Sequence, residues 1–175
     1  MRDWSHCPRC GATLTRSIPP GDDEDRLLCP ACGLVLYENP APTASAVLVD
    51  DRGRVMLTRR GIEPFRGMWD LPGGFVRPGE DGGQAARREL LEETGLEIVP
   101  GRVLAIVPDT YGPDGEPTLN IFYLARVAGG TARPASDVSE IAWFGAGELP
   151  ERAQIAFRCV RDVLERWRRE DVSET

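Results

Sequence analysis

Apolar residues come in short, strand-sized runs along most of the chain. These runs predict five strands: Ala44–Asp50, Arg54–Arg60, Ile98–Val107, Thr118–Val127 and Ile141–Phe144. No run approaches the roughly 20 apolar residues that a membrane-spanning helix needs. The segment between Arg60 and Pro72 has no such pattern and is expected to be a long loop.

Two segments have the pattern of a helix instead. Residues 84–94 are rich in strong helix formers and are followed by Gly95, which favours a helix end. In residues 152–169, apolar side chains recur every four positions, which predicts an amphipathic closing helix with Ile155, Cys159, Val163 and Trp167 on its buried face. Strands and helices together predict an α/β fold in which mixed sheets lie between the two helices, over residues 44–171.

Composition and charge narrow the range of functions. Of the 175 residues, 41% are hydrophobic and 28% charged, as in folded proteins, and the net charge of −7 argues against nucleic acid as the main partner. The chain has no lysine, which excludes a catalytic Schiff base and a phosphate-loop lysine. It has one histidine, His6, so a Ser-His-Asp mechanism is not expected. Since the first residues contain no apolar signal segment, we expect a cytoplasmic protein.

Four of the five cysteines form two C-x-x-C pairs near the N-terminus, Cys7/Cys10 and Cys29/Cys32. Pairs at this separation are typical of tetrahedral zinc sites, and four cysteine ligands make a closed, structural site. The alternatives are two disulfides or a redox-active pair, which are less expected in the cytoplasm. The sequence therefore predicts a zinc ribbon over residues 1–36, with a hairpin tip at 18–25 and a returning strand at 26–28. A proline-containing linker follows over residues 37–43.

The first predicted helix carries an unusual acidic face. Glu89, Glu92 and Glu93 are spaced i, i+3 and i+4, so their carboxylates share one side and repel one another. A hard divalent cation such as Mg²⁺ or Mn²⁺ would remove this repulsion. The helix alone leaves open the alternative of an ordinary solvated acidic face.

The wider spacing favours the metal-binding interpretation. Gly74, Glu80 and the run Arg88-Glu89-Leu90-x-Glu92-Glu93-x-Gly95-Leu96 resemble the Nudix box at all nine signature positions, over 23 residues. The resemblance implies the Nudix α/β/α sandwich and metal-dependent hydrolysis of a nucleoside diphosphate linked to another group.

The same resemblance assigns roles to individual residues. Glu89, Glu92 and Glu93 would supply metal ligands or the general base, and the Gly73 carbonyl would reach a metal ion. Glu80 would support the glutamates, and Arg88 would orient them. A further acid often comes from a later loop in this family, for which Asp137 and Glu140 are the candidates here. Both could equally be ordinary loop acids.

A ribbon ahead of the box is similar to two groups within the family. These are the NADH diphosphatases and, more closely, the ADP-ribose and FAD diphosphatases of the plant plastid type. Residues 108–113 lack the Ser-Gln-Pro-Trp type motif of the NADH group. Candidates for binding the substrate are the aromatic residues Trp69 and Tyr111, which could stack on a base, and an arginine that could bind phosphate: Arg59, Arg60 or Arg66. The alternative for the two aromatic residues is core packing.

Three functions therefore remain at this point. The first is Mg²⁺-dependent cleavage of ADP-ribose, FAD or an NADH-like substrate into two monophosphates. The second is a sanitising pyrophosphatase for damaged nucleoside triphosphates such as 8-oxo-dGTP. The third, of another class, is a zinc-ribbon binding module with a vestigial Nudix fold, which would have no need for the intact acidic set. The family resemblance also implies a homodimer.

Overall fold

The structure, a computed structural model, describes residues 4–113 and 115–169. The chain divides into two compact units, Met1–Asn39 and Pro40–Thr175. Each unit has its own hydrophobic core, so each is described by itself. The last two residues of the predicted second domain, 170 and 171, lie outside the described residues.

The smaller unit is a three-stranded antiparallel sheet in the order β1-β2-β3, with bounds Thr15–Ser17, Arg26–Leu28 and Val35–Leu36. The pairing of Thr15 with Leu28 confirms the predicted hairpin and returning strand. At each C-x-x-C pair, a glycine with a positive φ angle closes a tight turn: the N–H of Gly11 donates to Cys7 O and that of Gly33 to Cys29 O, both at 2.9 Å.

These turns bring the four cysteine sulfurs of the smaller unit together. All four lie within 4.8 Å of one another, and none of these cysteines forms a disulfide. The Sγ atoms of Cys7 and Cys32 are 3.7 Å apart, and those of Cys10 and Cys29 are 3.5 Å apart. A zinc ion with four sulfur ligands at about 2.3 Å needs sulfur–sulfur distances of about 3.8 Å. The sulfur cluster therefore has the chemistry and the size that a structural zinc ion requires.

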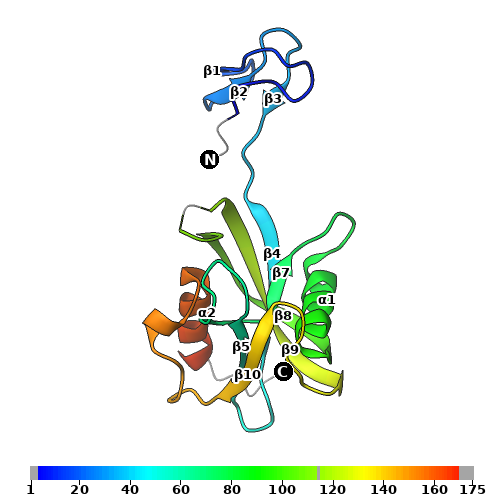
Figure 1. Ribbon diagram of the computed structural model, residues 1–175, viewed down its shortest axis with the longest axis vertical. Helices are drawn as coiled ribbons and strands as arrows, with labels where there is room; N and C mark the ends of the chain where they lie inside the picture. Colours follow the sequence, from blue (N-terminus) through cyan, green and yellow to red (C-terminus); the bar gives the residue numbers. More distant parts are fainter. Residues whose placement is uncertain (1–3, 114, 170–175) are drawn as a thin grey trace. The chain divides into compact units, whose positions relative to one another are not determined.

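Within its described residues, the larger unit contains an antiparallel sheet, a mixed sheet and two α-helices. One sheet has the order β10-β5-β6, with bounds Val138–Phe144, Val55–Arg60 and Trp69–Asp70. The other has the order β7-β4-β9-β8, with bounds Gly73–Phe75, Ala41–Leu48, Pro117–Gly130 and Leu96–Thr110, and β4 runs parallel to β9. The helices α1 (Gly82–Thr94) and α2 (Arg158–Arg169) lie on opposite sides of the sheets (Figure 1). This arrangement confirms the predicted α/β fold.

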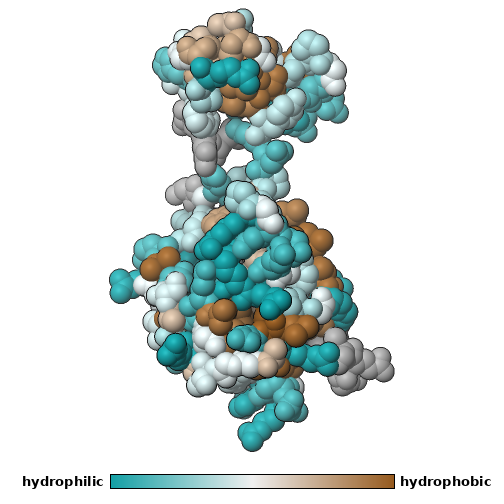
Figure 2. Space-filling view, turned by 90° about the vertical axis from the view of Figure 1, so that its right-hand side faces the viewer, coloured by the Kyte–Doolittle hydropathy of each residue, from teal (hydrophilic) through white to brown (hydrophobic). Residues whose placement is uncertain are grey.

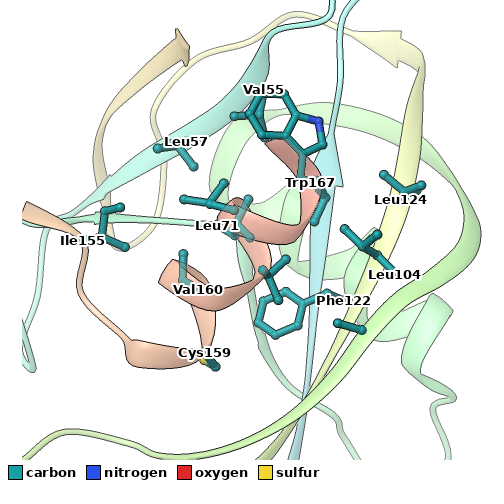
Figure 3. Close-up of a cluster of buried hydrophobic side chains, with 14 of the residues drawn as sticks. Val55, Leu57, Leu71, Leu104, Phe122, Leu124, Ile155, Cys159, Val160 and Trp167 are labelled. Atoms are coloured by element: carbon teal, nitrogen blue, oxygen red, sulfur yellow. The ribbon is translucent and has the colours of Figure 1, made fainter. Parts of the chain in front are cut away.

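Strand β4 separates the two halves of the core. Its side chains alternate: Val47 packs in a cluster with α2, whereas Ala46 and Leu48 pack in a second cluster with Leu90 of α1. Figure 3 shows the first cluster, in which the side chains of α2 point toward the sheet residues. Its labelled members are Val55, Leu57, Leu71, Leu104, Phe122, Leu124, Ile155, Cys159, Val160 and Trp167.

Two boundaries predicted from the sequence are wrong. Strand β4 begins at Ala41, inside the predicted linker, because its parallel pairing with β9 already starts there. Pro42 has no N–H to donate to the sheet, but its carbonyl accepts a hydrogen bond from Val76 N at 3.0 Å. The predicted loop between Arg60 and Pro72 contains the short strand β6, which pairs with β5.

The closing helix also starts later than predicted. A 3₁₀ turn, η1, covers Arg152–Gln154, and Ile155 then takes an extended conformation. The backbone of this extended stretch pairs with β6, and Ala156 N donates to Trp69 O at 2.8 Å. Ile155 is buried as predicted, but it reaches the core from outside the helix. None of the helices within the described residues is long and apolar enough to cross a membrane.

A carboxylate from β8 caps the start of α2. Asp109 Oδ2 accepts a hydrogen bond from Cys159 N at 2.7 Å, which satisfies one of the free N–H groups in the first turn. Burial acts to raise the pKa of Asp109, but the N–H groups of Cys159 and Thr110 outweigh it, so the pKa lies below its ordinary value. The capping bond thus stabilises the folded state through the ionised carboxylate.

We therefore predict that Asp109→Ala destabilises the larger unit by about 1–2 kcal/mol, as loss of a helix cap does. Because the folded-state pKa is lowered from 3.8, this difference from wild type is full above about pH 4 and shrinks as the pH falls through the folded-state pKa. Urea unfolding at several pH values measures it. Asp162→Ala, on the exposed face of the same helix, is the control and changes stability by less than about 0.5 kcal/mol.

For the smaller unit, we predict one zinc ion per chain, lost in Cys29→Ser. Without the metal, residues 4–39 lose their backbone protection against hydrogen exchange, because two of the three buried members of their hydrophobic cluster are the cysteines Cys7 and Cys29, and the third is Leu14. The larger unit keeps its protection, since it has separate cores. Metal analysis together with hydrogen exchange tests both statements. A metal-free ribbon that stayed fully protected would contradict them.

Candidate active site

The acidic helix is anchored at both ends by its own sequence. Asp81 caps α1 by accepting from Gln84 N at 2.8 Å, and the Gln84 side chain accepts from Asp81 N at 2.9 Å in return. At the other end Gly95 takes the left-handed conformation, with φ 71°, and its N–H donates to Leu91 O. These two caps fix the helical register and therefore the directions of the glutamates.

Two glycines let β7 approach both its neighbours closely. Gly73 has φ 157°, and a Cβ atom there would lie 2.4 Å from Ala44 O of β4. A Cβ atom on Gly74 would lie 2.6 Å from the carboxyl carbon of Glu89. A larger residue at either position would push β7 away from β4 or from α1. The glycine pair thus sets the spacing between the strand and the acidic helix.

Arg88 organises the acids at the entrance to the helix. Its Nε and Nη2 atoms donate to the two carboxylate oxygens of Glu80 at 2.6 and 2.8 Å. Its Nη1 donates to Glu89 Oε1 at 2.5 Å, and its Nη2 also reaches Phe75 O at 3.1 Å. The bonds from Arg88 lower the pKa of Glu80 to about 2. Glu80 therefore stays ionised and holds the guanidinium of Arg88 in place.

A cleft of about 290 Å³ lies beside these groups. Several predicted site residues line it, namely Gly73, Glu89, Glu93, Tyr111 and Asp137. They come from β7, from α1, from the end of β8 and from the loop before β10, so the fold gathers residues that are far apart in the sequence.

Glu93 is the most deeply buried acid of the cleft, with 6% of its surface exposed. Burial raises its pKa well above the ordinary value, and the charges of Asp137, Asp70 and Glu89 raise it further. The N–H of Gly73, which donates to Glu93 Oε2 at 3.1 Å, acts in the opposite direction. Within the described residues, no arginine forms an ion pair with Glu93 or Asp137.

This set of donors fits a hard divalent cation. All the acidic ligands are oxygen atoms, and a buried carboxylate without a protein cation is stabilised by a metal ion or by a proton. Only the four cysteines, among the described residues, bring at least three candidate ligand atoms all within 4.8 Å of one another. The carboxylates of the cleft are more widely spaced, as expected for like charges.

Other predicted residues lie away from the cleft. Glu92 is exposed and pairs with Arg77 at 3.3 Å, and Glu140 pairs with Arg59 at 3.2 Å. Arg66 is exposed and does not line the cleft. Glu92 also accepts a hydrogen bond at 3.4 Å from Nη1 of Arg88, the atom that binds Glu89.

Trp69 belongs to the core, which was the alternative interpretation of its sequence position. It is 6% exposed, and its ring packs edge-on against Phe144 at 5.0 Å. The guanidinium of Arg59 covers it, 4.6 Å from the ring centre. The buried ring is therefore not free to stack on a base.

The sequence did not single out Asp70, although it lines the cleft. Burial raises its pKa to about 6, while its ion pair with Arg60 at 3.0 Å acts to lower it. Arg60 also donates to Pro64 O at 2.7 Å and lies over the ring of Phe157. The clue in the sequence is the position of the polar Asp70 between the apolar Trp69 and Leu71. The sequence pattern of this segment nevertheless predicts a loop.

Comparison with known proteins agrees with this geometry. A family model described as NUDIX domain matches residues 39–163, and one described as Nudix N-terminal matches residues 5–38. A solved structure of a NUDIX hydrolase from Nitrosomonas europaea is 30% identical, with a TM-score of 0.79, over 96% of this chain and 92% of that one.

Two relatives with named activities are also similar. An ADP-ribose pyrophosphatase of Methanocaldococcus jannaschii is 32% identical over 136 residues, 76% of this chain and 78% of the relative. An NAD-capped RNA hydrolase NudC of Stutzerimonas stutzeri is 29% identical over 145 residues, 82% of this chain and 49% of the relative. The chain thus spans about half the length of that NudC. On the acidic cleft and these matches together, the chain belongs to the Nudix family and is a Nudix hydrolase.

Proposed function

We propose that this protein hydrolyses the diphosphate of a nucleoside diphosphate linked to a second group, such as ADP-ribose, FAD or NADH, into two monophosphates. The observation that carries the proposal is the buried carboxylate of Glu93, which faces other acids of the cleft. The two arginines of the cleft lining, Arg60 and Arg77, pair with Asp70 and Glu92 instead, so a bound cation would offset the charge of Glu93 and help an anionic substrate to approach.

Glu89 and Glu93, with the Gly73 carbonyl, are the proposed holders of Mg²⁺ or Mn²⁺. When bound, the cation offsets the charge of the diphosphate and makes a water molecule more acidic. Arg88 keeps Glu89 aimed at the cleft, because it is itself fixed by Glu80. Glu92, which is exposed, would bind a further cation only at the rim.

Asp137 is the proposed general base. Its side chain lines the cleft and forms no ion pair with an arginine of the described residues. Glu140, the other loop acid, is engaged by Arg59 and lies outside the cleft. A carboxylate that is free to accept a proton can contribute about 10²–10⁴-fold to the rate.

The proposed substrate class rests on the two named relatives and on the wall of the cleft. Tyr111 stacks on Phe157 with ring centres 5.7 Å apart, and both line the cleft. This aromatic wall offers apolar contact to the second group of a linked substrate. The net charge of −7 favours a small nucleotide over a long RNA chain.

A homodimer and a cytoplasmic location are further proposals. Five apolar side chains of β8 and β9 are 37–59% exposed, which offers contact area to a second copy: Val99, Val103, Ile106, Leu119 and Val127. Figure 2 shows separate hydrophobic patches on one face of the larger unit.

Product analysis with Mg²⁺ tests the function. The panel is ADP-ribose, FAD, NADH, NAD-capped RNA and 8-oxo-dGTP. We expect AMP together with ribose 5-phosphate, FMN or the reduced nicotinamide mononucleotide. Glu93→Gln and Asp137→Asn should each lower kcat/KM by about 10²–10³-fold, since one removes a cation ligand and the other the base.

Glu97→Gln is the matched control, because Glu97 is an exposed glutamate just beyond the end of α1. It should stay within about twofold of wild type. Pyrophosphate released from 8-oxo-dGTP alone would assign the protein to the sanitising class. Absence of turnover on every substrate would contradict the catalytic proposal.

A further inference from the structure

We propose that Ser136, Ala135 and Gly61 are positioning residues that hold Asp137 in the cleft before any substrate binds. This inference rests on the proposed role of Asp137 as general base. It goes further because it states how the loop acid is positioned. The loop is attached to the acidic helix and to the end of β5, so Asp137 is already in place before substrate binds.

The first attachment is to the C-terminal end of α1. Arg133 N donates to Thr94 O and Ala135 N donates to Glu93 O, both at 2.9 Å. The last carbonyls of a helix lack partners within the helix, so they are natural acceptors for an approaching chain. Glu93 thereby contributes its side chain to the cleft and its backbone carbonyl to the loop. The position of the base is tied directly to that of the proposed cation ligand.

The second feature is the backbone conformation of Ser136. Its φ angle is +55°, in the left-handed region that non-glycine residues rarely adopt. The side chain is exposed, so packing does not impose this conformation. A turn closes around it, with Val138 N donating to Ala135 O at 3.1 Å. Ser136 thus reverses the chain immediately before Asp137 and directs that residue back toward the helix.

The third feature is an attachment of the loop to the end of β5. Gly61 N donates to Asp137 O at 2.6 Å, and a Cβ atom on Gly61 would lie 2.8 Å from the same oxygen. Only glycine leaves room for this contact. Ser139 Oγ also donates to Arg59 O at 3.1 Å, just beyond Asp137. The backbone of Asp137 is therefore held from both sides.

Asp137 lines the cleft together with Glu93 of α1 and Asp70 of β6. Burial raises the pKa of both of these acids, and the charge of Asp137 raises it further. Like charges repel, so a free loop would move Asp137 outward into water. Three backbone hydrogen bonds to α1 and to the end of β5 oppose that movement, and they also hold Ser136 at its unfavourable φ angle. A preorganised site commonly contains such repulsion and backbone strain, because its reactive groups are held in their working positions before substrate binds.

Kinetics of substitutions at Ser136 test the inference. Ser136→Val, whose β-branched side chain disfavours a positive φ, should lower kcat about 10- to 100-fold, since a displacement of about 1 Å can cost that much. KM should change less than about twofold, because the other residues of the cleft are untouched. Ser136→Gly and Ser136→Asn, which adopt positive φ readily, should retain the wild-type kcat. Ala132→Val, in the same exposed loop, is the control.

Amide hydrogen exchange on the metal-free, substrate-free protein gives a readout independent of activity. We expect the amides of Ala135 and Gly61 to be protected already in this state, and Ser136→Val to lose that protection. Fast exchange in the wild type, with protection only after substrate and Mg²⁺ are added, would overturn the inference. So would a Ser136→Val enzyme with unchanged kcat while Asp137→Asn is inactive, which would leave the proposed function standing. If no substrate is turned over, the proposed function fails and exchange alone decides the inference.

Discussion

The burial of the Glu93 carboxylate among other acids is the constraint on which the site depends. Glu93 lies at the C-terminal end of α1 and is 6% exposed, and its carboxylate accepts a hydrogen bond from the backbone N–H of Gly73. An uncompensated buried charge is costly, and stability alone would favour an apolar residue there. A cation bound at this carboxylate would offset that cost in stability. The same need explains why Arg88 engages Glu80 and Glu89 but leaves Glu93 to the cleft.

The rest of the fold serves to hold this carboxylate against its neighbours. The caps at Asp81 and Gly95 fix the helix, and the glycines of β7 allow the strand to approach it closely. The loop before β10 then attaches to the last carbonyls of the same helix, at Glu93 and Thr94. Backbone hydrogen bonds and close glycine contacts therefore carry out the positioning. The large hydrophobic clusters on either side of β4 supply the rigidity behind it.

Much of this could be predicted from the sequence, because some of its patterns are local. The helix formers before Gly95, the spaced glutamates and the paired cysteines indicated α1, its acidic face and the ribbon. Tertiary pairing was harder to foresee: β6 pairs with β5 on one side and with the extended Ile155 on the other, and no local pattern encodes those contacts. For the same reason the sequence leaves open whether Trp69 stacks on a base or packs in the core, and it does not single out Asp70. Adjacent side chains of a strand point to opposite sides, so one entered the core and the other the cleft.

The thermal unfolding of wild type and Glu93→Gln, each with and without Mg²⁺, tests the central claim most directly. Because the substitution removes a buried acid, we expect the metal-free variant to be at least as stable as the metal-free wild type at neutral pH. Mg²⁺ at about ten times its Kd should stabilise the wild type by about 1.4 kcal/mol and the variant by much less. An equal gain in both proteins would show that the buried carboxylate does not hold the cation, and would contradict the account.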